Sequence, residues 1–438
     1  MQHAPPRRGV AVSLAVALTA TMGLAACGSD DSAGGGTPTL TWYINPDVGN
    51  SDPSAEKGGQ AYLAKRCSDA SNGKYKINVQ LLPNDASAQR EQLLRRLAAG
   101  DKSMDLMSID PVFVSEFAQA GYLAPVPKKY EAEFTEDRVK SSVTASTWEG
   151  ELVAVPFWSN TQLLWYRKSV AKKAGLDMSQ PVTWDQLIKA AKSGKTDIGV
   201  QAALYEGYTV WINALIAGAG GKILDNPGAK GKDIKLDLDS PEGKKAAQII
   251  GTIARDGLGG PAMGNSTETE SLDSFKLKRA NYLVNWAYTY GALGDKAKAD
   301  VAATLYPRTE DGRKSAPPYG GIQLGVGAKS AHTGLAYDAA ACVAGKENQA
   351  IYMSKAGNPA SRKAAYTDPA VLKAFPNGIA KTIRTSLDQA IPRPQSQYYG
   401  DISTGIQQRF SPPSSVTTKT PASTQKFILE VLKGEALL

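Results

Sequence analysis

The chain has 438 residues, of which 42% are hydrophobic, and a formal net charge of +8. That length is enough for two lobes with separate hydrophobic cores. The basic residues are spread among 42 acidic ones, without the dense basic block and interleaved aromatic residues of nucleic-acid-binding proteins. Histidine occurs only at His3 and His332, so a zinc site or a histidine-based catalytic triad would depend almost entirely on one residue. We therefore expect no metal, no cofactor and no nucleic-acid partner.

The N-terminal segment has the pattern of an export signal. Arg7 and Arg8 precede a short apolar run, residues 9–22, which is too brief to span a bilayer as a mature helix. The run ends in LAAC at residues 24–27, which resembles the lipobox of bacterial lipoproteins, where the cysteine is lipidated before cleavage. An ordinary signal peptide with an incidental cysteine is the alternative. The pattern predicts a signal peptide over residues 1–26 and lipidation of Cys27.

Residues 27–38 form the segment that follows the predicted cleavage point. Three adjacent glycines, with Ser and Asp around them, give a composition typical of a flexible tether. No later stretch is long and apolar enough for a transmembrane helix. We expect a soluble body anchored by lipid to the outer face of the cytoplasmic membrane.

Strand and helix patterns alternate at the start of this body. Residues 39–44 read as a strand, 54–70 as a helix, 75–82 as a strand and 87–99 as a helix. A third strand over 105–109 is followed by a helix that ends near residue 120. Repeated strand–helix units predict a parallel sheet with helices on both sides.

The second half begins with a strand at 151–156, and residues 157–166 are expected to cross into another region. Thr183 and Gln186 have the spacing of a capping box, and Ser240-Pro241 predicts the start of a helix that ends at Gly257. Residues 282–286 read as a strand, and 322–326 as a strand that returns to the first region. The remainder, from residue 335, is mainly helical.

Polar and aromatic side chains gather where the predicted strands end. Ligands of open α/β sheets bind beside the carboxyl ends of the strands. Carboxylates and amides at those positions can pair with vicinal hydroxyl groups, and an indole can pack against the apolar face of a pyranose. The pattern is typical of a sugar site, and its candidate residues are Asn45, Asp47, Asn50, Gln89, Asp110, Asn160 and Trp286.

Several of these residues have a structural alternative. Asp110 stands before Pro111 and could simply cap the next helix, Asn160 could close a turn, and Trp286 could pack in the core. Glu206 and Glu268 could be solvated loop acids. Arg393 lies between two prolines, an arrangement that favours function over a mere surface charge.

Catalytic signatures are missing from the chain. There is no nucleophile elbow, P-loop, C-x-x-C pair or H-E-x-x-H motif, so we do not expect an enzyme. A cell-wall glycoside hydrolase that uses two carboxylates stays open as the alternative of another class. Cys67 and Cys342, in an oxidising compartment, are candidates for one long-range disulfide, and two separate buried thiols are the alternative.

Ordered motifs over the whole body resemble one family. They are TLTWYINPD at 39–47, the segment 89–121, AVPFWSNTQLLWYRK at 154–168, YEGYTVWINALIAGAGG at 205–221, NYLVNWAYTYGAL at 281–293, PPYGGIQLGVGAKS at 317–330 and NPASRKAAYTDPAV at 358–371. The chain is similar to the extracellular solute-binding proteins of ABC sugar importers, a family that includes maltose- and trehalose-binding proteins. Within it, the motifs look most similar to the trehalose-binding lipoproteins of actinobacterial importers.

This resemblance implies a fold, a mechanism and partners. The implied fold is a two-lobed α/β periplasmic-binding-protein fold, each lobe a mainly parallel sheet flanked by helices, with the ligand in the cleft between lobes. Lobe 1 would comprise residues 39–156 and 319–360, and lobe 2 residues 157–318 and 361–438. A monomeric receptor would close on a disaccharide, trehalose or else maltose or another small sugar, and deliver it to the membrane permease.

The resemblance also implies which residues contact the ligand. Glycine at 320 and 321 would let backbone amides approach the sugar closely. The implied ligand-binding set is Asn50, Gln89, Asp110, Asn160, Glu268, Trp286, Gly320, Gly321 and Arg393.

Overall fold

The computed structural model describes residues 36–47 and 51–438. The predicted leader, the predicted lipidation site Cys27 and the candidate Asn50 lie outside the described residues. Residues 37–438 make up one compact unit, and no helix among the described residues has both the length and the apolarity needed to cross a bilayer.

One sheet runs through the body in the strand order β2-β1-β3-β10-β6-β8-β7, with β9 also paired to β6. Its strands are β1 (Thr39–Ile44), β2 (Lys76–Leu81), β3 (Leu106–Ile109), β6 (Val155–Arg167), β7 (Asp197–Gly199), β8 (Ala280–Trp286), β9 (Val301–Thr304) and β10 (Tyr319–Gly325). A separate hairpin pairs β4 (Thr147–Trp148) with β5 (Glu151–Leu152). The strands expected near residues 39, 75, 105, 282 and 322 are thereby confirmed.

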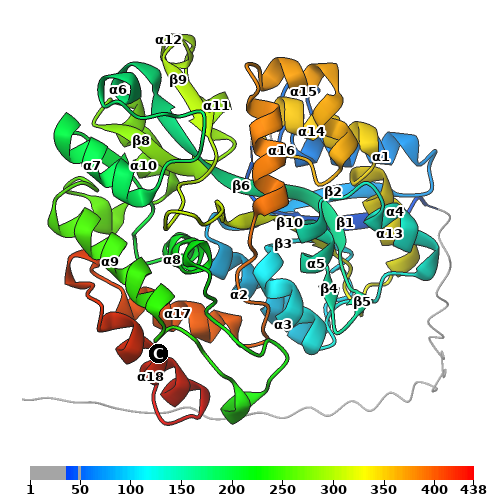
Figure 1. Cartoon of the computed structure of the whole chain (residues 1–438). Helices are drawn as coiled ribbons and strands as arrows, with labels where there is room; N and C mark the ends of the chain where they lie inside the picture. The colour runs from blue at the N-terminus through cyan, green and yellow to red at the C-terminus, as the bar shows by residue number, and fades with distance from the viewer. Residues whose placement is uncertain (1–35, 48–50) are drawn as a thin grey trace, which may run out of the picture. The chain divides into compact units, whose positions relative to one another are not determined.

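Strand β6 joins the two lobes. The first part of this strand pairs with β10, from Val155 to Thr161, and the second part pairs with β8, from Gln162 to Tyr166. Figure 1 shows β6 passing from the group of elements around β1–β3 to the group around β8. The two-lobed α/β fold is confirmed. The sheet is mixed, because β6 and β10 run antiparallel to their neighbours, while β1 pairs parallel with β2 and β3, and β7 with β8.

The helices lie on both sides of this sheet (Figure 1). Around β1–β3 are α1 (Gln60–Ala70), α2 (Ala86–Ala98), α3 (Val114–Gln119), α4 (Lys128–Thr135), α5 (Lys140–Ala145) and α13 (Thr333–Val343). Around β7–β9 are α6 (Lys168–Lys173), α7 (Trp184–Gly194), α8 (Glu206–Ala219), α9 (Pro241–Arg255), α10 (Glu268–Lys276), α11 (Thr289–Ala292), α12 (Asp295–Lys298), α17 (Tyr399–Arg409) and α18 (Thr420–Leu432). Three more, α14 (Lys346–Ala356), α15 (Pro369–Ala374) and α16 (Ile379–Gln389), pack beside β6.

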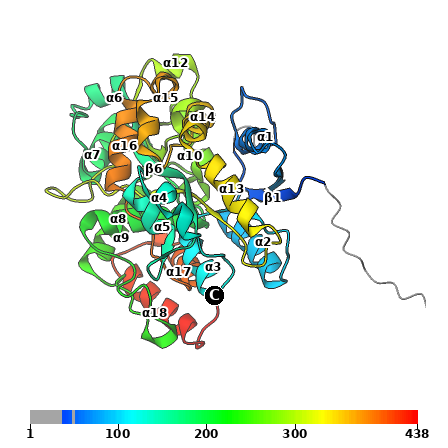
Figure 2. The same cartoon turned by 90° about the vertical axis from the view of Figure 1, so that its right-hand side faces the viewer.

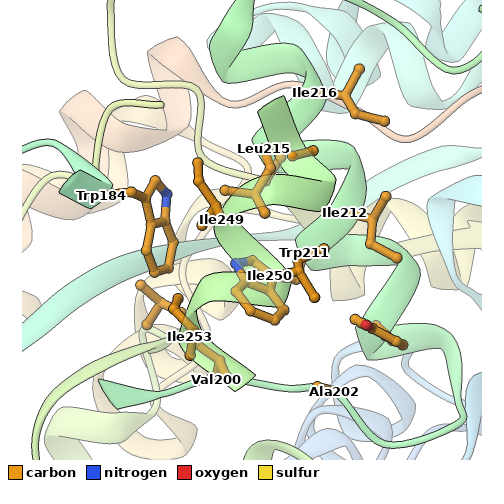
Figure 3. Close-up of a cluster of buried hydrophobic side chains, with 14 of the residues drawn as sticks. Trp184, Val200, Ala202, Trp211, Ile212, Leu215, Ile216, Ile249, Ile250 and Ile253 are labelled. Carbon is orange, nitrogen blue, oxygen red and sulfur yellow. The ribbon is translucent and has the colours of Figure 1, made fainter. Parts of the chain in front are cut away.

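Local signals in the sequence account for where several helices begin. Thr183 and Gln186 form the predicted capping box of α7, and Ser240 caps α9 with Pro241 at its first position. The core of the second lobe is assembled from these helices. Trp184 of α7, Trp211 of α8 and Ile250 of α9 point toward one another in Figure 3. Burial of these large apolar surfaces holds α7, α8 and α9 together, and thereby holds the start of α8 in place.

Helices α1 and α13 are far apart in the sequence and pack against each other in the first lobe (Figure 2). Cys67 of α1 and Cys342 of α13 form a disulfide across this contact. Of the two alternatives for these cysteines, the structure has the bonded pair.

Candidate functional site

The guanidinium of Arg393 is the centre of a buried ion-pair network. Its Nη1 donates to Oε1 of Glu206 at 2.5 Å, and its Nη2 donates to Oδ1 of Asp110 at 2.9 Å. The exposed fractions of the side chains are 2% for Arg393, 6% for Glu206 and 19% for Asp110. Residues from three distant parts of the chain therefore meet at one point, and Asp110 is the member that solvent reaches most.

Glu206 lies at the start of α8 and is fully engaged. Its Oε1 also accepts from the hydroxyl of Tyr399, and its Oε2 accepts from Ser403 Oγ at 2.6 Å. Burial raises the pKa of Glu206, while the Arg393 charge and the two hydroxyl donors act in the opposite direction. Burial acts to lower the pKa of Arg393, but the carboxylates of Asp110 and Glu206 outweigh this effect and hold the pKa above its usual value. Glu206 is thus a support for Arg393 and not the solvated loop acid that the sequence allowed.

Asp110 performs the capping role and the site role at the same time. Its Oδ1 accepts from the backbone N–H of Val112 at 3.2 Å, which caps the short turn of residues 111–113 after β3. The bond from Arg393 ends on the same Oδ1. Among the described residues none donates to Oδ2, so this second oxygen is available as an acceptor.

A second group of site residues surrounds Trp286, at the end of β8. The indole Nε1 donates to Oε1 of Glu268 at 3.2 Å, and the Tyr205 hydroxyl donates to Oε2 of the same carboxylate at 2.7 Å. Burial and the Glu268 charge raise the pKa of Tyr205, so its hydroxyl stays protonated and acts as a donor. Glu268 therefore engages both of its oxygens with the protein.

Gly320 and Asn160 lie beside Trp286. The two are direct partners across the β6–β10 pairing, and a Cβ on residue 320 would come within 2.9 Å of Cη2 of Trp286. Asn160 is buried; its Oδ1 accepts from the Thr161 N–H at 3.0 Å, and its Nδ2 donates to no other described residue.

The two glycines owe their presence to contacts within the protein. At Gly320 the indole of Trp286 fills the space of a side chain, and at Gly321, where φ is +119°, a Cβ would lie 2.2 Å from the Trp158 carbonyl oxygen. A side chain at either position would meet protein atoms whether or not a ligand approaches, and at Gly321 the positive φ disfavours one as well.

Gln89 makes no hydrogen bond to the described residues around Arg393 or Trp286. Its Nε2 donates to the Pro83 carbonyl at 2.8 Å, which ties α2 to the end of β2.

Sequence reasoning missed the supporting residues. Tyr205, Tyr399 and Ser403 have no signal of their own, because each acts through a partner at least 60 residues away.

Asp47, another candidate from the sequence, lies just after β1, and burial raises the pKa of its carboxyl group to about 6. It accepts from the Tyr352 hydroxyl.

No cluster of three or more His, Cys, Asp or Glu side chains within residues 36–47 and 51–438 could hold a metal ion. The side chains described above offer a solute hydrogen-bonding groups, an ion pair and an aromatic ring.

A family model for bacterial extracellular solute-binding proteins matches residues 54–350. The chain belongs to this family. As a member of an extracellular solute-binding family, it binds its solute outside the cytoplasm, and the family's members are binding proteins and not enzymes.

Individual relatives agree with this assignment. A probable ABC transporter-binding protein of Deinococcus radiodurans is 26% identical over 77% of this chain and 79% of its own length. A sn-glycerol-3-phosphate-binding periplasmic protein of Agrobacterium fabrum is 29% identical over 32% of this chain and 34% of its own. Maltose-bound MalE3 of T. maritima has the same fold, with a TM-score of 0.75, 22% identity, and coverage of 91% of this chain and 100% of that one.

Proposed function

We propose that this solute-binding protein captures a small neutral sugar, a disaccharide with trehalose as the first choice, and delivers it to the permease of an ABC importer. The observation that carries the proposal is a set of unused hydrogen-bonding groups together with a partly exposed aromatic ring. Asp110 Oδ2 can accept from a hydroxyl, Asn160 Nδ2 can donate to one, and the half-buried indole of Trp286 offers an apolar surface. Maltose or another small sugar is the alternative within the class.

The charges of the site favour a neutral solute over a phosphate. Asp110, Glu206 and Glu268 contribute three carboxylates, and among the described side chains that bond to them Arg393 is the one cation. An added phosphate would meet uncompensated negative charge in a region of low dielectric constant. We therefore expect sugars to bind and sn-glycerol 3-phosphate not to bind.

Titration of the purified protein with trehalose, maltose, glucose and sn-glycerol 3-phosphate, followed calorimetrically, tests the proposal. Asp110→Asn should lower the affinity for the sugar about 10- to 100-fold, because it turns the Oδ2 acceptor into a donor while the other oxygen can still cap and pair. Asp368→Asn is the matched control, since Asp368 also caps a helix, α15, and belongs to no candidate ligand-binding set. The absence of heat with every sugar would reject the proposal.

Delivery to a permease implies that the two lobes close around the sugar and that a lipid anchor keeps the protein at the membrane. Both statements belong to the proposal. The lobes would be residues 39–156 with 319–360, and 157–318 with 361–438, closing on the sugar as one monomer. Lipidation of Cys27 would keep the receptor beside its permease. Cys27→Ala protein should then leave the membrane fraction and bind sugar normally, while cells that express it take up labelled sugar poorly; retention in the membrane fraction would contradict the anchor.

A further inference from the structure

Two consecutive residues at the start of α8 support two different sides of the site. Tyr205 donates to Glu268, which accepts from the indole of Trp286. Glu206, the next residue, accepts from Arg393. The Tyr205 hydroxyl lies directly over the following glycine, because a Cβ on Gly207 would come within 2.0 Å of it.

Glu268 is itself held firmly against β8. Its backbone carbonyl accepts from Nδ2 of Asn285 at 3.0 Å, and Oδ1 of that amide accepts from the Trp286 N–H at 2.7 Å. As the first residue of α10, Glu268 also places its carboxylate at the positive end of the helix dipole. The indole of Trp286 is therefore bonded to Glu268 directly, and the backbone N–H of Trp286 is linked to Glu268 through the side chain of Asn285.

An indole without such a tie would sample several side-chain rotamers, and ordering it on binding would reduce affinity. One edge of the indole lies close to the backbone of Gly320, since Cη2 is 2.9 Å from the position that a Cβ would take there. The bond to Glu268 limits the indole at Nε1. Together these contacts hold the ring in one orientation before any solute arrives.

We propose that Tyr205, Glu206 and Glu268 are positioning residues. Through them, the start of α8 fixes the positions of the Trp286 and Arg393 side chains relative to each other. This rests on the proposed function in one respect, namely that Trp286 and Asp110, the carboxylate that Arg393 holds, contact the solute. Glu268 then acts on binding only through the indole, although the family resemblance made it a ligand contact.

A double-mutant cycle separates the two roles of Glu268. Glu268→Ala should weaken sugar binding about tenfold in the wild-type background and have no further effect in the Trp286→Phe background, because a phenyl ring has no Nε1 to hold. Glu268→Gln, which retains an oxygen acceptor for Nε1, should stay within about threefold of wild type. Asp273→Ala, an exposed position on the same helix, is the control and should change nothing. Equal losses in both backgrounds, or no loss in either, would overturn the proposal.

A second measurement needs no sugar. The indole Nε1–H resonance of Trp286, identified by its disappearance in Trp286→Phe, should exchange its hydrogen at least about tenfold faster in Glu268→Ala and detectably faster in Tyr205→Phe. Unchanged exchange would contradict the positioning role even if sugar binds. Faster exchange in a protein that binds no sugar would retain the positioning role and reject the proposed function.

Discussion

Arg393→Met is expected to lower the free energy of unfolding by about 3–5 kcal/mol and to abolish sugar binding. The substitution keeps much of the side-chain volume and removes the charge, so Glu206 is left as a buried carboxylate with only hydroxyl donors. Removing one member of a buried ion pair is strongly destabilising for this reason. Urea unfolding monitored by circular dichroism, together with calorimetry, measures both effects.

A second substitution distinguishes the buried charge from the lost packing. Arg393→Met combined with Glu206→Gln removes the unpaired charge as well, and we expect it to regain more than half of the lost stability. Sugar binding should stay absent in the double variant, because the guanidinium is missing in both proteins. If the double variant is no more stable than Arg393→Met alone, the network does not carry the stability that we assign to it.

This experiment also bears on how the lobes are joined. Asp110 follows β3 of the first lobe, whereas Glu206 begins α8 of the second, and Arg393 bonds to both. Tyr399 reinforces the same junction: its hydroxyl bonds to Glu206 while its ring packs edge-on against Phe113, beside Asp110, at 5.9 Å between centroids. Loss of Arg393 should therefore weaken the contact between the two lobes even where each lobe stays folded.

Sequence reasoning located the site residues near the strand ends better than it located the residues that hold them in place. Asp110 and Trp286 could be found because they follow strands, and strands have a local signature in hydrophobic residues and in the proline or polar residues that end them. Arg393 could be found because two prolines flank it. These are local patterns, readable within a few residues.

The supporting residues could not be predicted in the same way. The burial of Glu206 depends on Arg393, 187 residues later, and nothing near Glu206 distinguishes it from a surface acid. The role of Glu268 depends similarly on Tyr205, 63 residues earlier. The mixed character of the sheet was missed because strand direction between β6 and β10 is a property of the returning chain and not of either segment.

Removal of the Cys67–Cys342 disulfide is the second change with a large expected effect. The bond joins residues 275 positions apart, and a crosslink over so long a loop strongly restricts the unfolded chain. Cys67→Ala with Cys342→Ala should therefore lower the free energy of unfolding by about 2–5 kcal/mol. Urea unfolding of the double variant and of dithiothreitol-reduced wild type should give the same lowered midpoint.

Sugar affinity provides the contrasting readout for this variant. Cys67 belongs to the apolar core that includes Leu40 and Tyr337, and Cys342 packs against that core, so the bond lies within the first lobe. It restrains α1 against α13 without crossing to the second lobe, so closure around the solute should proceed as before. The double variant should then bind sugar within about threefold of wild type at a urea concentration where both are folded. A tenfold loss of affinity there would show that the order of the first lobe, set by this bond, extends to the turn that Asp110 caps and to the part of β6 that carries Asn160.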